Sequence, residues 1–204
     1  MADQIDLEPL KSEERGLLTD ADLHLVNLFE TAMNSATQIN VNEIAEKFVT
    51  EVSKFAPKGQ SGLDPISFVS SFFQVLIHIA SRVPHRNIGQ DVLVRTVVLL
   101  QDGGYSDEID PMWKNLSDFA ILMRDSWNHS PTFEPEDDDD QAFSELEWLN
   151  LNSFVARLFK SDIVNWYSFP IWEIKLGLES PINEEAAAVN TRVRVATEDR
   201  YIRA

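Results

Sequence analysis

The side chains that most often carry out chemistry are few in this sequence, and their spacing matches no catalytic or metal-binding pattern. The chain has four histidines and no cysteine. The absence of cysteine excludes thiolate nucleophiles, zinc ribbons and cysteine-ligated iron–sulfur clusters. No pair of histidines has the spacing that holds zinc on a metalloprotease helix. We therefore predict neither a metal site nor a bound cofactor.

Among the histidines, His78 is the one open to two interpretations. It lies between Ile77 and Ile79, so its position predicts a neutral, hydrogen-bonded histidine in the core. The alternative is a ligand or a general base that faces a pocket. We favour the core position. His85 directly follows Pro84 and is expected in a loop.

The segments that could hold phosphate or calcium also lack the required spacing. The glycine clusters at 59–62 and 103–104 match no phosphate-binding loop. Residues 134–140 carry six carboxylates within seven residues, but they lack the glycine and the alternating ligands of an EF-hand. Because like charges repel and stay hydrated, this run predicts a solvated acidic loop over 128–141. A docking site for a basic partner is the alternative.

Aromatic residues are concentrated in the carboxyl-terminal half of the chain. Tryptophan combines a large apolar surface with one hydrogen-bond donor, which suits it to pocket walls and interfaces. Helices that meet through such residues could enclose an apolar pocket, although helical spacing alone favours an ordinary core. All five tryptophans lie in this half: Trp113, Trp127, Trp148, Trp166 and Trp172.

The segment 148–158 contains polar residues in unusual positions. Asn152 follows Trp148 by four residues and therefore falls on the apolar stripe of the expected helix. Asn150, Ser153 and Arg157 form a second, polar stripe. A buried amide without a partner costs about 1–3 kcal/mol. We favour a hydrogen bond from Asn152 to the backbone of a neighbouring helix or turn. The alternative is that Asn152 and Arg157 present polar groups to an aromatic pocket.

The apolar residues recur at helical spacing nearly throughout, which predicts an all-α fold. We expect one single-domain bundle of about eight helices with orthogonal or layered packing, in which the helices near 65–80, 87–100 and 144–159 are central. Capping signals occur at Thr19, Asn40, Asp64 and Ser144, and the glycines at 103–104 suit a helix end. Residues 1–18 show no period and are expected to form a flexible N-terminal arm before a helical domain over 19–204.

The charge of the chain bears on its partners. Lys and Arg total 17 against 34 Asp and Glu, which gives a formal net charge of −17. Such a chain repels nucleic acid and anionic membranes, and its apolar runs are far shorter than the ~20 residues of a membrane span. The charged amino terminus lacks the apolar stretch of a signal peptide. We expect a cytoplasmic or nuclear protein without nucleic-acid or membrane partners.

Residues 148–158, followed by 172–179, resemble a fungal family of helical proteins of unknown function. The segment 113–119 leading to Trp127 and Asn128 fits the same pattern, as does the helix before Pro84, so the resemblance spans about 65–200. It implies a fungal, intracellular protein with an association with secondary metabolism. It supplies no catalytic residues.

Two functions of different classes remain. The first is a non-enzymatic helical binding or regulatory module with an aromatic recognition surface for a protein partner or a small apolar ligand, since no catalytic pattern is present and the acidic field could select a basic partner. The second is a cofactor-independent cyclase or isomerase acting on an apolar secondary metabolite, because such catalysis needs little more than a shaped pocket. For either function the candidate residues are Trp148, Asn152, Arg157, Trp166, Trp172 and His78.

Overall fold

A computed structural model describes residues 4–13, 19–35, 38–55, 65–103, 113–114, 116–127, 129, 131 and 143–164. The chain divides into two compact units, Met1–Ile163 and Val164–Ala204. The second unit lies outside the described residues except for Val164. All the elements below belong to the first unit.

The described residues form seven α-helices and no strand, which confirms the all-α prediction. No helix among them is long and apolar enough to cross a membrane. The count agrees with an expectation of about eight, and the capping signal expected at Asp64 lies outside the described residues. The helices are α1 (Glu8–Glu13), α2 (Asp20–Ser35), α3 (Val41–Phe55), α4 (Pro65–Arg82), α5 (Gly89–Asp102), α7 (Ser117–Trp127) and α8 (Glu145–Lys160).

Local sequence signals set several of these boundaries. At α2 the backbone amide of Asp22 donates to Thr19 Oγ1 (3.2 Å), and the Thr19 amide donates to the Asp22 carboxylate (2.9 Å). The same reciprocal capping box joins Ser144 and Glu147 at the start of α8. Gly103 ends α5 with a φ of 76°, a conformation that glycine adopts without strain.

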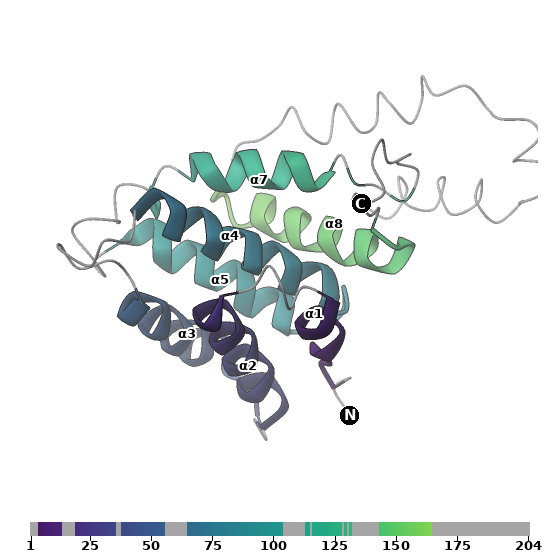
Figure 1. Cartoon of the computed structure of the whole chain (residues 1–204), viewed down its shortest axis with the longest axis horizontal. Helices are drawn as coiled ribbons and strands as arrows, with labels where there is room; N and C mark the ends of the chain where they lie inside the picture. The colour runs from purple at the N-terminus through teal and green to yellow at the C-terminus, as the bar shows by residue number, and fades with distance from the viewer. Residues whose placement is uncertain are drawn as a thin grey trace, which may run out of the picture. The chain divides into compact units, whose positions relative to one another are not determined.

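The helices pack in layers (Figure 1). Helices α4 and α5 form the middle layer, with α2 and α3 on one side and α7 and α8 on the other. Helix α3 packs against α5, whereas α8 contacts both α4 and α5. The central positions expected for the helices near 65–80 and 87–100 are therefore confirmed, whereas the helix near 144–159, also expected to be central, lies as α8 in an outer layer with α7.

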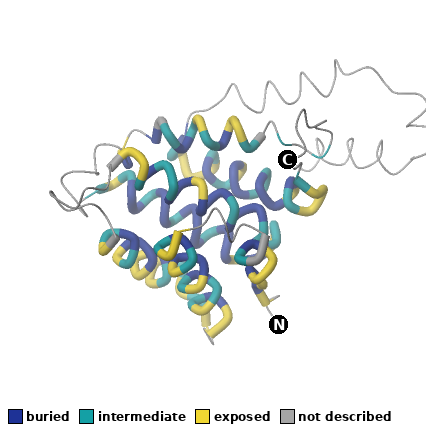
Figure 2. Tube along the Cα trace, viewed as in Figure 1, coloured by how far each residue is buried: buried dark blue, intermediate teal, exposed yellow. Residues whose placement is uncertain are grey.

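The middle layer supplies most of the core. Figure 2 shows α4 and α5 largely buried, whereas exposed residues lie on the outer turns of α2, α3 and α7. An aromatic cluster joins α4 to α7 and α8: Phe73 stacks on Phe119 at 4.8 Å between ring centroids and meets Trp113 edge-on at 5.1 Å. Phe119 in turn meets Phe154 of α8 at 6.2 Å. Two tryptophans of the aromatic half, Trp113 and Trp148, are thus buried in this part of the chain.

The start of the chain differs from the flexible arm expected over residues 1–18. Within 4–13 the chain forms α1, and Ile5, Leu7 and Leu10 are at most 2% exposed. The apolar residues are spaced first by two, as in extended chain, and then by three, as in a helix. No single period therefore covers these residues, and a search for periodic apolar spacing does not detect them.

The aromatic cluster predicts a strong dependence of stability on Phe73. We expect Phe73→Ala to lower the free energy of unfolding by about 3–5 kcal/mol, because a fully buried ring is lost and a cavity remains. Ile121 on α7 is 49% exposed, and its replacement by alanine should change stability by less than about 0.5 kcal/mol. Urea denaturation followed by circular dichroism measures both. Similar losses for the two variants would contradict this description of the core.

Candidate functional site

The turn between α4 and α5, residues 83–88, is partly buried: Arg86 and Ile88 are exposed, whereas other residues of the turn face the interior. Val83 and Asn87 are buried, as are Gly89 and Gln90 directly after the turn. Buried backbone amides and carbonyls need hydrogen-bond partners. Several side chains of α5 and α8 supply these hydrogen-bond partners.

Asn150 of α8 is the central partner of this turn. Its Oδ1 accepts the backbone amide of His85 at 2.8 Å, and its Nδ2 donates to the carbonyl of Ser81 at 2.8 Å. The side chain is buried. One amide therefore satisfies two backbone groups on α4 and the turn.

Two further residues of α8 reach the same turn. Ser153 Oγ donates to the carbonyl of His85 at 3.1 Å, and Arg157 Nη2 donates to that oxygen at 3.1 Å. The Arg157 guanidinium also forms an ion pair with Asp91 in the first turn of α5. The polar stripe noted in the sequence, Asn150, Ser153 and Arg157, is thus brought together on the α4–α5 turn.

Gln90, near the start of α5, is a further hydrogen-bond donor to backbone carbonyls of α4 and the turn. Its Nε2 donates to the carbonyls of Ala80 (3.0 Å) and Val83 (2.7 Å). Asn87 adds a local bond, since its Oδ1 accepts the Gly89 amide at 2.8 Å. Among the described residues, Gln90 Oε1 has no hydrogen-bond partner although it is buried. Because carbonyl oxygens surround the nitrogen, the amide cannot flip to improve this balance.

The sequence analysis did not identify Gln90. Its signal is its place three residues before Leu93 and seven before Val97, both buried on α5. A polar amide on an apolar stripe marks a buried hydrogen bond. The same rule was applied to α8 but selected the wrong asparagine.

Asn152, predicted to be the buried amide of α8, is only half-buried, and Asn150 takes that place. Asn152 Nδ2 donates to the carbonyl of Trp148 within its own helix at 2.7 Å. The favoured bond to a neighbouring helix or turn is therefore wrong for Asn152 and correct for Asn150. Trp148 lies at the edge of the buried stripe, so the position four residues later also falls at the edge.

The other candidate residues do not form one cluster with the turn. Trp148 is 5% exposed and stacks with Phe143 at 6.3 Å between ring centroids. His78 is half-buried in the middle of α4, and His85 lies in the turn as expected. Trp166 and Trp172 lie outside the described residues.

The arrangement is suited to holding a turn rather than to transforming a substrate. The polar groups of Asn150, Ser153 and Arg157 are directed to protein backbone or to Asp91. Within the described part of the chain, no three His, Asp or Glu side chains lie close enough together to hold a metal ion. Two open hollows lined by described residues lie elsewhere, beside residues 4–6 and 38–43.

Comparison with known proteins identifies one family. Residues 73–200, more than half of the chain, match the family model described as "Protein of unknown function (DUF3632)". The matched range includes the α4–α5 turn and α8. No curated protein and no solved structure matches this chain.

The geometry separates the two asparagines of α8 by their effect on stability. Asn150→Ala leaves the His85 amide and the Ser81 carbonyl without their partner, so we expect a loss of about 2–3 kcal/mol in the free energy of unfolding. Asn152→Ala, the matched control, removes only a bond within α8 and should change stability by less than about 0.5 kcal/mol. The urea midpoints of the two variants give the comparison. Equal midpoints would mean that Asn150 does not support the turn.

Proposed function

We propose that this chain, which belongs to the DUF3632 family of proteins of unknown function, is a non-enzymatic binding or regulatory module of fungal origin. Its proposed recognition surface lies at the start of α8, around Trp148, and its proposed partner is a protein segment that carries positive charge and apolar side chains. The observation that carries the proposal is a pair of exposed leucines beside the two ends of the acidic loop.

Leu146 and Leu149 are the exposed leucines. They are 61% and 38% exposed, and their spacing places them on one face of α8. Single exposed apolar residues are ordinary in proteins. A pair on one face at a helix start forms a small apolar surface, and a partner that covers the exposed parts of both leucines gains about 1.5–3 kcal/mol in total.

The acidic loop is attached at the same place. The backbone amide of Phe143 donates to the carbonyl of His129 at 2.8 Å, so the two ends of the loop lie together. Phe143 stacks on Trp148. The six carboxylates at 134–140 are connected through the chain to this point, and their charge attracts a basic partner to the neighbouring leucines.

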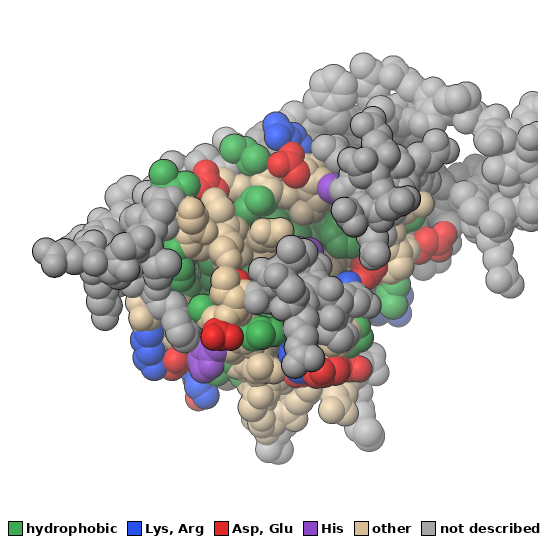
Figure 3. All heavy atoms as spheres, in the orientation of Figure 1, with side chains coloured by type: hydrophobic (Ala, Val, Ile, Leu, Met, Phe, Trp, Pro, Cys, Tyr) green, Lys and Arg blue, Asp and Glu red, His purple; other side chains and the backbone are tan. Residues whose placement is uncertain are grey.

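Charge on the rest of the described surface is mixed. On the face shown in Figure 3, acidic and basic side chains both occur among the described residues. The net charge of −17 is therefore not spread evenly, since six of the acidic residues lie within the run at 134–140. This concentration supports placing a basic partner near the ends of the acidic loop.

A cyclase or isomerase was the second function expected from the sequence, and no specific observation favours it. Asn152 bonds to the carbonyl of Trp148, and Arg157 bonds to the His85 carbonyl and Asp91. Both residues were candidates to present polar groups to an apolar substrate. Their contacts support structural roles instead.

The setting of the protein is part of the proposal. The resemblance carried by 148–158 and 172–179 implies a fungal, intracellular protein, cytoplasmic or nuclear, with an association with secondary metabolism. Purification from its source followed by native mass spectrometry separates a bound protein from a small apolar ligand by mass.

The leucine pair gives the sharpest test of the proposed surface. The probe is a short helical peptide of leucine and lysine with a fluorescent label, and fluorescence anisotropy measures its binding to the full chain. We expect Leu146→Ser with Leu149→Ser to weaken binding at least about tenfold, because the apolar contact is lost. Added salt should weaken binding to the unsubstituted chain, because it screens the carboxylates.

Ile66→Ser is the matched control for this test. Ile66 is 55% exposed in the first turn of α4, whereas the Arg82–Glu147 ion pair of 2.6 Å joins the other end of α4 to the start of α8. Residues 66 and 82 are about 24 Å apart along the helix. Equal loss of binding in the control and the double variant would refute the proposed surface.

A further inference from the structure

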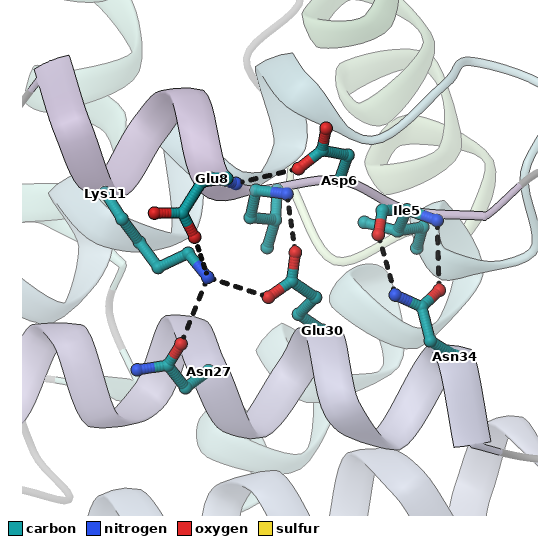
Figure 4. A network of polar contacts seen from close by, with 8 residues as sticks. Ile5, Asp6, Glu8, Lys11, Asn27, Glu30 and Asn34 are labelled. Atoms are coloured by element: carbon teal, nitrogen blue, oxygen red, sulfur yellow. Dashed lines mark hydrogen bonds and ion pairs between the residues drawn. The ribbon is translucent and has the colours of Figure 1, made fainter.

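Residues 4–13, here called the N-terminal strap, lie along α2 (Figure 4). Side chains of α2 form hydrogen bonds with the backbone of the strap. The strap is extended over its first residues and ends in α1. Its apolar side chains are buried, and its backbone is held by polar residues of α2. The contacts are those of a groove that binds a peptide.

Asn34 holds the backbone of Ile5 at both of its polar groups. Asn34 Oδ1 accepts the Ile5 amide at 3.0 Å, and its Nδ2 donates to the Ile5 carbonyl at 2.7 Å. Paired bonds of this kind satisfy an extended chain in the way a neighbouring strand would. They depend on the backbone of residue 5 and not on its side chain.

Glu30 and Asn27 continue this contact along α2. Glu30 accepts the Leu7 amide at 2.8 Å and the Lys11 ammonium at 2.9 Å through its two oxygens. Lys11 Nζ also donates to Asn27 Oδ1 at 3.2 Å. Hydrogen bonds to Glu8 and Glu30 raise the pKa of Lys11 above its usual value, so this ammonium is charged near neutral pH. The spacing of 27, 30 and 34 places these side chains on one face of α2.

The buried side of the strap is apolar and closely fitted. Ile5, Leu7 and Leu10 are buried. A methyl group at Gly89 would lie 3.0 Å from Cδ1 of Ile5 and 3.1 Å from Val83 Cγ1. The strap therefore approaches the α4–α5 turn so closely that a side chain at position 89 would force neighbouring side chains, Ile5 among them, to shift by a few tenths of an ångström.

The groove is not filled completely by the strap. An open hollow of about 610 Å³ lies between residues 4–6 of the strap and the end of α2, lined by Glu30, Thr31, Asn34 and Ser35. The residues that hold the backbone of the strap thus also border unoccupied space. A longer bound segment could form these hydrogen bonds and also fill the hollow.

We propose that α2 and the α4–α5 turn form a peptide-binding groove, and that the N-terminal strap occupies it as a built-in competitor for a partner segment. The partner segment has the chemistry of the strap: apolar residues spaced as in Ile5, Leu7 and Leu10, followed by a basic residue that pairs with Glu30. This groove and the surface at Leu146 and Leu149 are separate, so each proposal stands or fails alone.

Competition follows from the geometry of the contacts. The strap and a partner would use the same groups of Asn34 and Glu30, so both cannot bind at once. The apparent affinity of a partner is its intrinsic affinity reduced by the fraction of molecules in which the strap is released. Any change that weakens the contacts of the strap therefore raises the apparent affinity of the partner segment.

The absence of cysteine permits a direct test in the full chain. Leu10→Cys creates a single thiol that reacts with a soluble thiol reagent only when the strap is released. The probe is a synthetic peptide with the sequence of residues 4–13. We expect the reaction rate to rise in proportion to one plus the ratio of the peptide concentration to the intrinsic Kd, which is the Kd of the peptide for the groove that the strap has left. The rise is about tenfold at a peptide concentration of about nine times this Kd.

Three controls make each outcome decisive. Val97→Cys places the thiol in the core of α5, and its reaction rate should not respond to the peptide. A peptide with serine at positions 5, 7 and 10 should have no effect on Leu10→Cys. Adding Asn34→Ala to Leu10→Cys should speed the reaction without peptide and reduce the response to peptide. No rise with the original peptide, or an equal rise in the Val97→Cys control, overturns the proposal.

A second measurement covers the case in which Leu10→Cys already releases the strap. Leu10→Asp in the full chain weakens the strap and leaves the groove unchanged. A fluorescently labelled peptide of residues 4–13 should then bind this variant at least about tenfold more tightly than the unsubstituted chain. Equal affinity for the two proteins, or no binding to either, contradicts a groove that exchanges its occupant.

Discussion

The first compact unit depends on the hydrogen bonds that satisfy the partly buried turn between α4 and α5. These two helices form the middle layer, so several backbone groups where the chain reverses direction are covered by other parts of the fold. Unpaired backbone groups at such a place cost about 1–3 kcal/mol each. Asn150, Ser153 and Arg157 supply partners from α8, and Gln90 supplies them from α5. These hydrogen bonds therefore join α8 and α5 to the end of α4 and the turn, in addition to the apolar contacts of the core.

Segments far apart in the sequence meet at this turn. Ile5 approaches it from the N-terminal strap, close to Gly89, and Asn150 reaches it from α8. The strap is therefore placed to respond to the turn, or to influence it, through direct contact. The range that matches the family begins at residue 73 and so includes the turn and α8, whereas the strap and α2 precede it. The strap contact therefore joins a segment outside the matched range to a turn inside it.

Sequence reasoning succeeded where a short-range rule decides the structure. The capping boxes at Thr19 and Ser144 and the positive φ of Gly103 depend on residues within one turn of a helix, and all three are present. The middle position of α4 and α5 was also predicted, because long apolar stripes must face one another. These features need no knowledge of which helix is the neighbour.

Prediction from sequence failed where the structure depends on a partner that is distant in the chain. Asn150 and Asn152 are two residues apart on one helix, and only the place where the α4–α5 turn crosses α8 decides which is buried. Gln90 became recognisable only with its carbonyl partners in view. The strap was missed because its apolar spacing changes from extended to helical within six residues.

Hydrogen exchange at the backbone amide of His85 tests most directly whether α8 holds this turn. The measurement compares the unsubstituted chain, Asn150→Ala and Asn152→Ala by NMR, with the Val94 amide in the middle of α5 as an internal reference. We predict that in Asn150→Ala, but not in Asn152→Ala, exchange at His85 rises at least about tenfold more than exchange at Val94, which follows the loss of global stability. Unchanged protection of His85 in Asn150→Ala, or equal loss in Asn152→Ala, would contradict it.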